Sequence, residues 1–165
     1  MSNLKDSPKA DKNTIPTAKD MRFGIVVSQW NSTVTKALLK GALALLKKQG
    51  VPDKNIIVKQ VPGSFELPLA AQLLQESQHT DAIICLGCVI QGETPHFDYI
   101  CNAVSQGIMN LNLKYSKPFI FGVLTCNNRQ QAIDRSGGIM GNKGEEAALT
   151  AISMIALKKE LTPKV

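Results

Sequence analysis

The sequence is poor in aromatic side chains and has no long apolar segment, and each absence excludes a class of protein. Aromatic residues make up 5% of the 165 residues, and the net charge of +6 comes from lysines and arginines scattered along the chain. Nucleic-acid-binding domains gather positive charge on one face and stack bases on aromatic rings. No apolar run reaches the ~18 residues of a membrane span, and the polar N-terminus lacks the apolar stretch of a secretory signal. We therefore expect a cytoplasmic protein that binds neither nucleic acid nor membrane.

Cysteine is also scarce, with Cys85, Cys88, Cys101 and Cys126 as its only occurrences. The pair Cys85 and Cys88 has the spacing of a redox or metal-binding motif, but it lies in an apolar run that predicts a buried strand. Residues three apart on a strand point to opposite faces of the sheet. The two thiols are therefore poorly placed to share a metal ion or to form a disulfide, and we expect reduced, structural cysteines and no metal site.

The order of apolar segments predicts one α/β domain. Residues 1–20 are polar, contain two prolines and show no periodicity, which indicates a flexible N-terminal arm before a single domain at 21–165. Strands are predicted at 23–27, 55–61, 82–89 and 119–124, and helices after residue 31 and at 65–76, 96–113, 129–136 and 143–160. Four such units predict a parallel sheet between layers of helices, with ligands beyond the carboxyl ends of the strands.

Several residues that follow the predicted strands have both a structural and a functional interpretation. Trp30 is the only tryptophan, and it either packs against the protein or stacks on a planar heterocycle. Glu66 either complements the dipole at a helix start or binds sugar hydroxyls. His96, in the first turn of a helix, is either an exposed histidine without a role or a proton carrier beside an anion site at the helix N-terminus.

A glycine-rich stretch, Gly137-Gly-Ile-Met-Gly-Asn142, lies between Arg135 and Lys143. It does not match the phosphate loop of nucleoside triphosphatases, because no Ser or Thr follows the lysine. The two cations are either solvated charges or phosphate ligands, and the guanidinium of Arg135 is suited to a bidentate phosphate contact.

Five of these segments, taken together, resemble the lumazine synthase family in order, spacing and identity. They are FGIVVSQWN at 23–31, VPGSFE at 61–66, GCVIQGETPHFDY at 87–99, FGVLT at 121–125, and 135–144, from Arg135 to GNKG. The similarity extends over roughly residues 21–157, so that only the N-terminal arm and the last few residues lie outside it.

The resemblance implies a flavodoxin-like three-layer α/β/α sandwich with a four-stranded parallel sheet and active sites shared between the subunits of a pentamer. It also implies an enzyme that condenses 5-amino-6-(D-ribitylamino)uracil with 3,4-dihydroxy-2-butanone 4-phosphate into 6,7-dimethyl-8-ribityllumazine, on the way to riboflavin, without metal or organic cofactor. Two alternatives are a non-catalytic flavodoxin-like module that binds flavin or a phosphorylated ligand, and a shell subunit with a vestigial site.

The resemblance also implies a role for individual residues. His96 matches the proton-transfer residue of the family, and Lys143 matches a lysine beside the site. The residues expected to bind the ribityl-aminouracil are Trp30, Ser64, Phe65, Glu66, Cys88, Val89, Ile90 and, from the neighbouring subunit, Phe121. Those expected to bind the sugar phosphate are Glu93, Thr94 and, from the neighbour, Arg135.

The higher assembly is a separate expectation. The turn after Arg135 is compact, which favours twelve pentamers in a 60-subunit shell over free pentamers. Ile139 stands where shell-forming members commonly carry lysine, and Gln91 where the family is often basic. Riboflavin synthase is a candidate partner.

Overall fold

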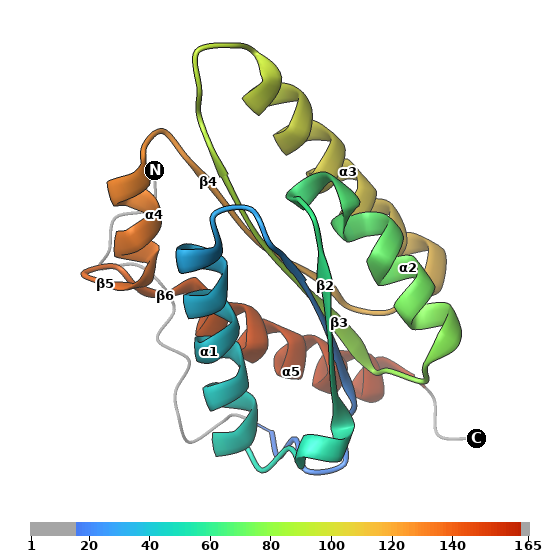
Figure 1. Ribbon diagram of the computed structural model, residues 1–165. Helices are drawn as coiled ribbons and strands as arrows, with labels where there is room; N and C mark the ends of the chain where they lie inside the picture. Colours follow the sequence, from blue (N-terminus) through green and yellow to red (C-terminus); the bar gives the residue numbers. More distant parts are fainter. Residues whose placement is uncertain (1–15, 163–165) are drawn as a thin grey trace.

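The computed structural model describes residues 16–162 and contains one parallel sheet of four strands. The strand order is β2-β1-β3-β4, so that β1 and β3 occupy the centre (Figure 1). This is the order of flavodoxin-like sheets, in which ligands bind where the strand order reverses, between the first and third strands. The strands are β1 (Phe23–Ser28), β2 (Ile56–Val61), β3 (Ala82–Ile90) and β4 (Phe119–Cys126).

Helices cover both faces of this sheet (Figure 1). One layer holds α1 (Ser32–Lys48), α4 (Arg129–Arg135) and α5 (Lys143–Leu161), and the other holds α2 (Leu67–Ser77) and α3 (His96–Tyr115). Short 3-10 helices precede β2 and α2, at η1 (Asp53–Asn55) and η2 (Ser64–Glu66), and a small hairpin of β5 (Ser136–Gly138) and β6 (Gly141–Asn142) joins α4 to α5. The predicted three-layer α/β/α sandwich is confirmed.

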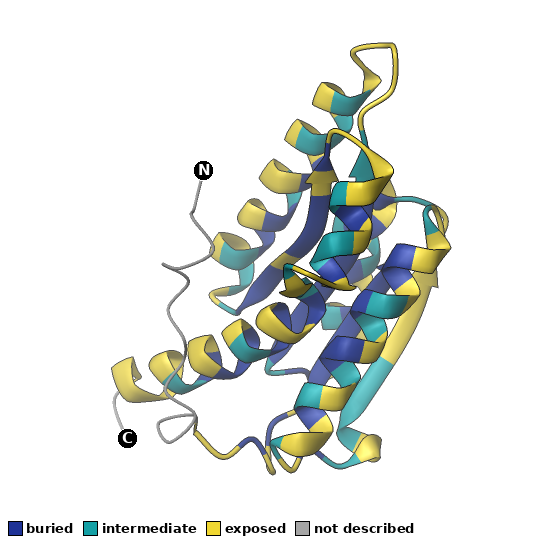
Figure 2. Ribbon diagram, turned by 90° about the vertical axis from the view of Figure 1, so that its left-hand side faces the viewer, coloured by how far each residue is buried: buried dark blue, intermediate teal, exposed yellow. Residues whose placement is uncertain are grey.

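The two central strands are apolar throughout because both of their faces are covered. All six residues of β1 are buried, and Figure 2 shows the buried strands between helices whose outer faces are exposed. Alternate residues of β3 enter different cores: Cys85 packs with α2 and α3, whereas Cys88 packs with α1 and α5. The prediction that these two cysteines point to opposite faces is therefore confirmed, and both thiols are free.

Three local details differ from the expectations. The predicted helix at 65–76 begins as the 3-10 turn η2, and the α-helix itself starts only at Leu67, with Pro68 in its first turn. Pro95, whose fixed φ suits the first helical position, is the N-cap of α3 instead. Asparagine commonly caps a helix through its side chain, but the side chain of Asn31, the N-cap of α1, does not bond to the helix, because it bonds to another strand, as described below.

The predicted N-terminal arm lies mostly outside the described residues, which begin at residue 16. Within its last residues, Ala18 is fully buried in the core beneath α1 and α5. The Ala18 nitrogen donates to the Gln49 carbonyl over 3.4 Å, and the Met21 nitrogen donates to the Ala18 carbonyl over 3.0 Å. Packed structure therefore begins before residue 21.

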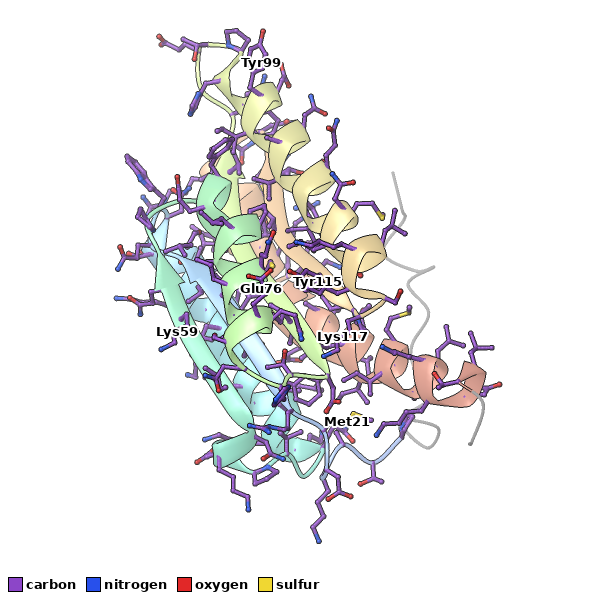
Figure 3. The ribbon with its side chains drawn as sticks, turned by 90° about the vertical axis from the view of Figure 1, so that its right-hand side faces the viewer. Met21, Lys59, Glu76, Tyr99, Tyr115 and Lys117 are labelled. Carbon is purple, nitrogen blue, oxygen red and sulfur yellow. The ribbon has the colours of Figure 1, made fainter. Side chains whose placement is uncertain are left out.

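The end of the sheet opposite the ligand side is held by side-chain bonds between α2 and α3. The Tyr115 hydroxyl donates to Glu76, and this bond, more than the nearby Lys114, lowers the pKa of the Glu76 carboxyl. Lys117 Nζ donates to the Thr80 carbonyl over 2.8 Å. Figure 3 shows Glu76 beside Tyr115, with Tyr99 at the other end of α3. Among residues 16–162, no helix combines the length and apolarity needed to cross a membrane.

Candidate active site

A cavity of about 570 Å³ lies at the carboxyl ends of β1, β2 and β3. It opens where β1 and β3 run side by side and their connections leave in opposite directions, which is the usual ligand site of such sheets. Its walls contain the predicted residues Trp30, Ser64, Phe65, Glu66, Cys88, Val89, Ile90 and His96, together with Asn31, Gly63 and Ile100. Folding thus gathers residues from four separate segments around one hollow.

Aromatic rings stand exposed at the mouth of this cavity. Trp30 is 72% exposed and Phe65 is 58% exposed, although both are large apolar side chains. The Trp30 nitrogen donates to the Pro62 carbonyl over 3.1 Å, which holds the β1–α1 loop against the β2–α2 loop. A ring that is 72% exposed is not packed within its own chain. The interpretation of Trp30 as a packing residue is therefore wrong for a single chain. Its flat face is available to a planar ligand.

Polar groups from the β2–α2 loop form one wall. Glu66 Oε2 accepts a hydrogen bond from the Gly63 nitrogen over 2.9 Å, which aims the exposed carboxylate into the hollow. The Ser64 hydroxyl is buried and has no hydrogen-bond partner among the described residues. A Cβ on Gly87 would lie 2.7 Å from Ser64 Oγ, so glycine is required there for the loop to sit on β3. The wall therefore offers one negative acceptor and one free hydroxyl.

His96 is exposed, faces the same cavity and is the first residue of α3. The start of a long helix carries unpaired N–H groups and a positive dipole end, which suit an anion. Glu93 and Thr94 lie in the exposed loop just before it, outside the lining of the cavity. In this position an imidazole can exchange protons with a ligand whose anionic group lies at the helix start.

The remaining predicted residues lie around a second cavity, of about 670 Å³, along the free edge of β4 between α3 and α5. Phe121 is 43% exposed there. The Arg135 guanidinium, half-buried, donates to the Gln131 carbonyl over 3.1 Å, and Lys143 Nζ lies 2.7 Å from the Glu146 carboxylate. In one chain the predicted site is therefore divided: Phe121, Arg135 and Lys143 do not line the cavity that contains His96.

Asn142, which the sequence reasoning did not single out, attaches the β5–β6 hairpin between Arg135 and Lys143 to α1. Its Nδ2 donates to the Ala37 carbonyl of α1 over 2.9 Å, and its Oδ1 accepts from the Gly144 nitrogen over 2.8 Å, which caps α5. An asparagine just before a helical segment is a recognised N-cap signal that could have identified it. The bond to α1 could not be read from the sequence.

The cysteines near the site are poorly suited to metal binding or nucleophilic chemistry. Burial raises the pKa of Cys85 and of Cys88 to about 12, so both thiols stay protonated near neutral pH. Within residues 16–162, no group of three or more His, Cys, Asp or Glu side chains is arranged to hold a metal ion.

Comparison with known proteins identifies the family. The family model for 6,7-dimethyl-8-ribityllumazine synthase matches residues 20–159. Proteins of that name include one from Cytophaga hutchinsonii, 57% identical over 153 residues, which cover 89% of this chain and 96% of the relative. One from Parabacteroides distasonis is 56% identical over 145 residues, 88% of this chain and 91% of the relative. One from Flavobacterium johnsoniae is 54% identical over 156 residues, which cover 94% of this chain and 82% of the relative. Because the family model matches most of this chain and the relatives are more than half identical to it, the chain belongs to the 6,7-dimethyl-8-ribityllumazine synthase family.

Proposed function

We propose that this protein catalyses, in the cytoplasm, the condensation of 5-amino-6-(D-ribitylamino)uracil with 3,4-dihydroxy-2-butanone 4-phosphate to give 6,7-dimethyl-8-ribityllumazine. The observation that carries the proposal is the cavity at the carboxyl ends of β1–β3, in which an exposed tryptophan, a carboxylate and a histidine face one hollow. Membership of the family supports the identity of the reaction.

The ribityl-aminouracil is assigned to this cavity. Trp30 stacks on the pyrimidine ring, and the end of β3 provides the floor through Cys88, Val89 and Ile90. Ser64, Phe65 and Glu66 hold the ring edge and the ribityl chain. The Glu66 carboxylate accepts one bond from Gly63 and can accept others, and the Ser64 hydroxyl has no protein partner among the described residues, so that both groups suit a polyol. The half-buried positions of Val89 and Ile90 leave apolar surface for the ring.

The sugar phosphate is assigned to the start of α3. Thr94 and the backbone at Glu93 bind the phosphate beside the helix N-terminus, where N–H groups and the helix dipole favour an anion. Arg135 joins them from a second chain, and Lys143 lies close by. Phe121, from the same neighbour, covers the pyrimidine pocket. This assignment is supported by the separation of the two cavities in one chain, since Phe121, on the edge strand β4, is 43% exposed and does not line the cavity that contains His96.

The chemistry needs few catalytic groups. The substrate amine attacks the ketone without an enzyme nucleophile, and one water leaves to give an imine. The imine loses a proton and expels phosphate, after which the second amine closes the ring with loss of a second water. His96 is the proton carrier for these steps, beside the departing phosphate. The larger contribution is the positioning of two reactants, which can lower a barrier by roughly 7–11 kcal/mol. No metal ion or organic cofactor is required by this sequence of steps.

A site shared between chains requires an oligomer, and from the resemblance to the family we infer a pentamer as the minimum assembly and a 60-subunit shell as the favoured one. Ile139 is 86% exposed at the tip of the β5–β6 turn, where an apolar side chain is suited to a contact between pentamers. Riboflavin synthase is a candidate partner of this assembly.

The decisive experiment mixes the purified protein with both substrates and follows the fluorescence of the lumazine formed. Turnover that requires both substrates and releases phosphate supports the proposal. Tight binding of a flavin or phosphorylated ligand without turnover would favour a binding module, and neither binding nor turnover would favour a shell subunit with a vestigial site.

A further inference from the structure

Asn31 has an unusual backbone conformation directly beside Trp30. Its φ of 56° and ψ of 44° lie in the left-handed region, and among the described residues Ser116 is the only other non-glycine with positive φ. Asparagine tolerates this region better than most residues. The conformation ends the three-residue connection from β1 to α1, and it determines the path of the chain directly after Trp30.

The side chain of Asn31 bonds across the sheet and not to its own helix. Asn31 Nδ2 donates to the Cys88 carbonyl over 3.0 Å, while the first turn of α1 is bonded only by the Asn31 carbonyl, which accepts from Val34 and Thr35. Backbone pairing between β1 and β3 ends at Val27 and Leu86. The Asn31 amide therefore takes the place of a backbone group and continues this pairing past the end of β1.

Trp30 is held between this bond and a second one on its other side. The Gln29 and Trp30 nitrogens donate to the Val61 and Pro62 carbonyls, over 2.8 and 3.1 Å, which attaches the loop to the end of β2. The Asn31 amide attaches it to β3. The indole makes few contacts of its own, since it is 72% exposed. Its orientation therefore depends on the backbone on either side of it.

We propose that Asn31 is a positioning residue that fixes the Trp30 ring over the floor formed by the end of β3. It acts on Trp30 through its left-handed backbone and through the hydrogen bond from its amide to the Cys88 carbonyl. The proposal rests on the proposed function in one respect, namely that a pyrimidine ring occupies the space between Trp30 and that floor.

Two substitutions remove the amide donor and tolerate the left-handed backbone. Asn31→Gly keeps the left-handed conformation and removes the amide, whereas Asn31→Asp keeps the size and replaces the N–H donor with a carboxylate that repels the Cys88 carbonyl. Ser116→Gly is the matched control, because Ser116 has a φ of 46° at the end of α3, away from the cavity. Circular dichroism verifies that each variant folds, and either Asn31 variant alone suffices for the test.

Trp30 is the only tryptophan, so its fluorescence reports on the proposal in the free protein. Time-resolved anisotropy should show faster local rotation of the indole in both Asn31 variants and no change in Ser116→Gly. The KM for the ribityl-aminouracil should rise about 3- to 10-fold, as expected for the loss of one neutral hydrogen bond, while kcat and the KM for the sugar phosphate stay within about twofold.

Unchanged indole rotation in every Asn31 variant that folds would overturn the proposal, and so would an equal loss in all kinetic constants, which would indicate general damage. The proposed function fails separately, if the parent protein forms no lumazine. In that case the anisotropy still decides whether Asn31 holds Trp30.

Discussion

His96 and Arg135 line different cavities of the folded chain, His96 at the carboxyl ends of β1–β3 and Arg135 at the free edge of β4. The resemblance to the lumazine synthase family implies that both residues act in the same condensation reaction. If they act on the same substrate molecule, they must come from two chains that meet with the β4 edge of one beside the β1–β3 end of the other. Such a head-to-tail contact gives a ring when the rotation between neighbouring chains closes, and an open filament when it does not.

Mixing inactive variants tests this arrangement directly. His96→Ala and Arg135→Ala chains, each impaired when assayed alone at a low concentration of the sugar phosphate, should regain activity when unfolded and refolded together, since about a quarter of the sites in a random ring combine an intact His96 with an intact Arg135. His96→Ala mixed with Glu66→Ala is the control: both changes fall in the same cavity, so no intact site can form. Equal recovery in the two mixtures, or none in the first, would contradict a site shared between chains.

Arg135→Ala should mainly weaken binding of the sugar phosphate. A guanidinium matches phosphate geometry, and a hydrogen bond to a charged group contributes about 1.5–3 kcal/mol, so the KM for the sugar phosphate should rise roughly 10- to 100-fold. The KM for the ribityl-aminouracil should change little. Kinetics with each substrate varied in turn measure both, and equal damage to the two KM values would count against the phosphate assignment.

His96→Ala should slow turnover by on the order of 10²-fold or less, because positioning of the two substrates survives the loss of one proton carrier. The affinity for a substrate analogue, measured by calorimetry, should stay near that of the parent. A variant that turns over at the parent rate would show that His96 has no role in proton transfer.

Ile139 tests the larger assembly. Light scattering should give a mass of about 1.1 MDa for a 60-subunit shell and about 90 kDa for a free pentamer of 17.9 kDa chains. Ile139→Asp should shift the protein toward pentamers, because it puts a charge on an exposed apolar contact. Ile139→Leu, which keeps an apolar side chain at this contact, should keep the shell. A parent protein that is only pentameric would refute the shell.

The buried cysteines should be inert in the folded protein. Burial raises the pKa of Cys85 and Cys88 to about 12, so at pH 8 the reactive thiolate is a very small fraction of each, and it grows only as the pH rises toward that value. Iodoacetamide followed by mass spectrometry should therefore label half-buried Cys101 before either of them. Rapid labelling of Cys85 without unfolding would contradict its burial.

Much of this architecture was determined by the sequence itself. The continuous apolar runs of β1 and β3 require cover on both faces, and the alternation along β3 places Cys85 and Cys88 in opposite cores. The segments that follow β1, β2 and β3 had to meet at one edge, because parallel strands end on the same side of a sheet. For that reason Trp30, Glu66 and His96 could be predicted to lie together.

Only the tertiary structure decided which residues far apart in the sequence form hydrogen bonds with one another. Asn31 reads as an ordinary helix cap, yet its amide reaches Cys88, and Asn142 reaches Ala37 from the far end of the chain. Ala18 lies within a polar segment, yet it is buried. Periodicity reports only whether a side chain is buried, whereas the partner of a hydrogen bond depends on which strands and helices become neighbours. The separation of Arg135 from His96 has the same origin, because β4 is the edge strand and its outer side faces away from the ends of β1 and β2.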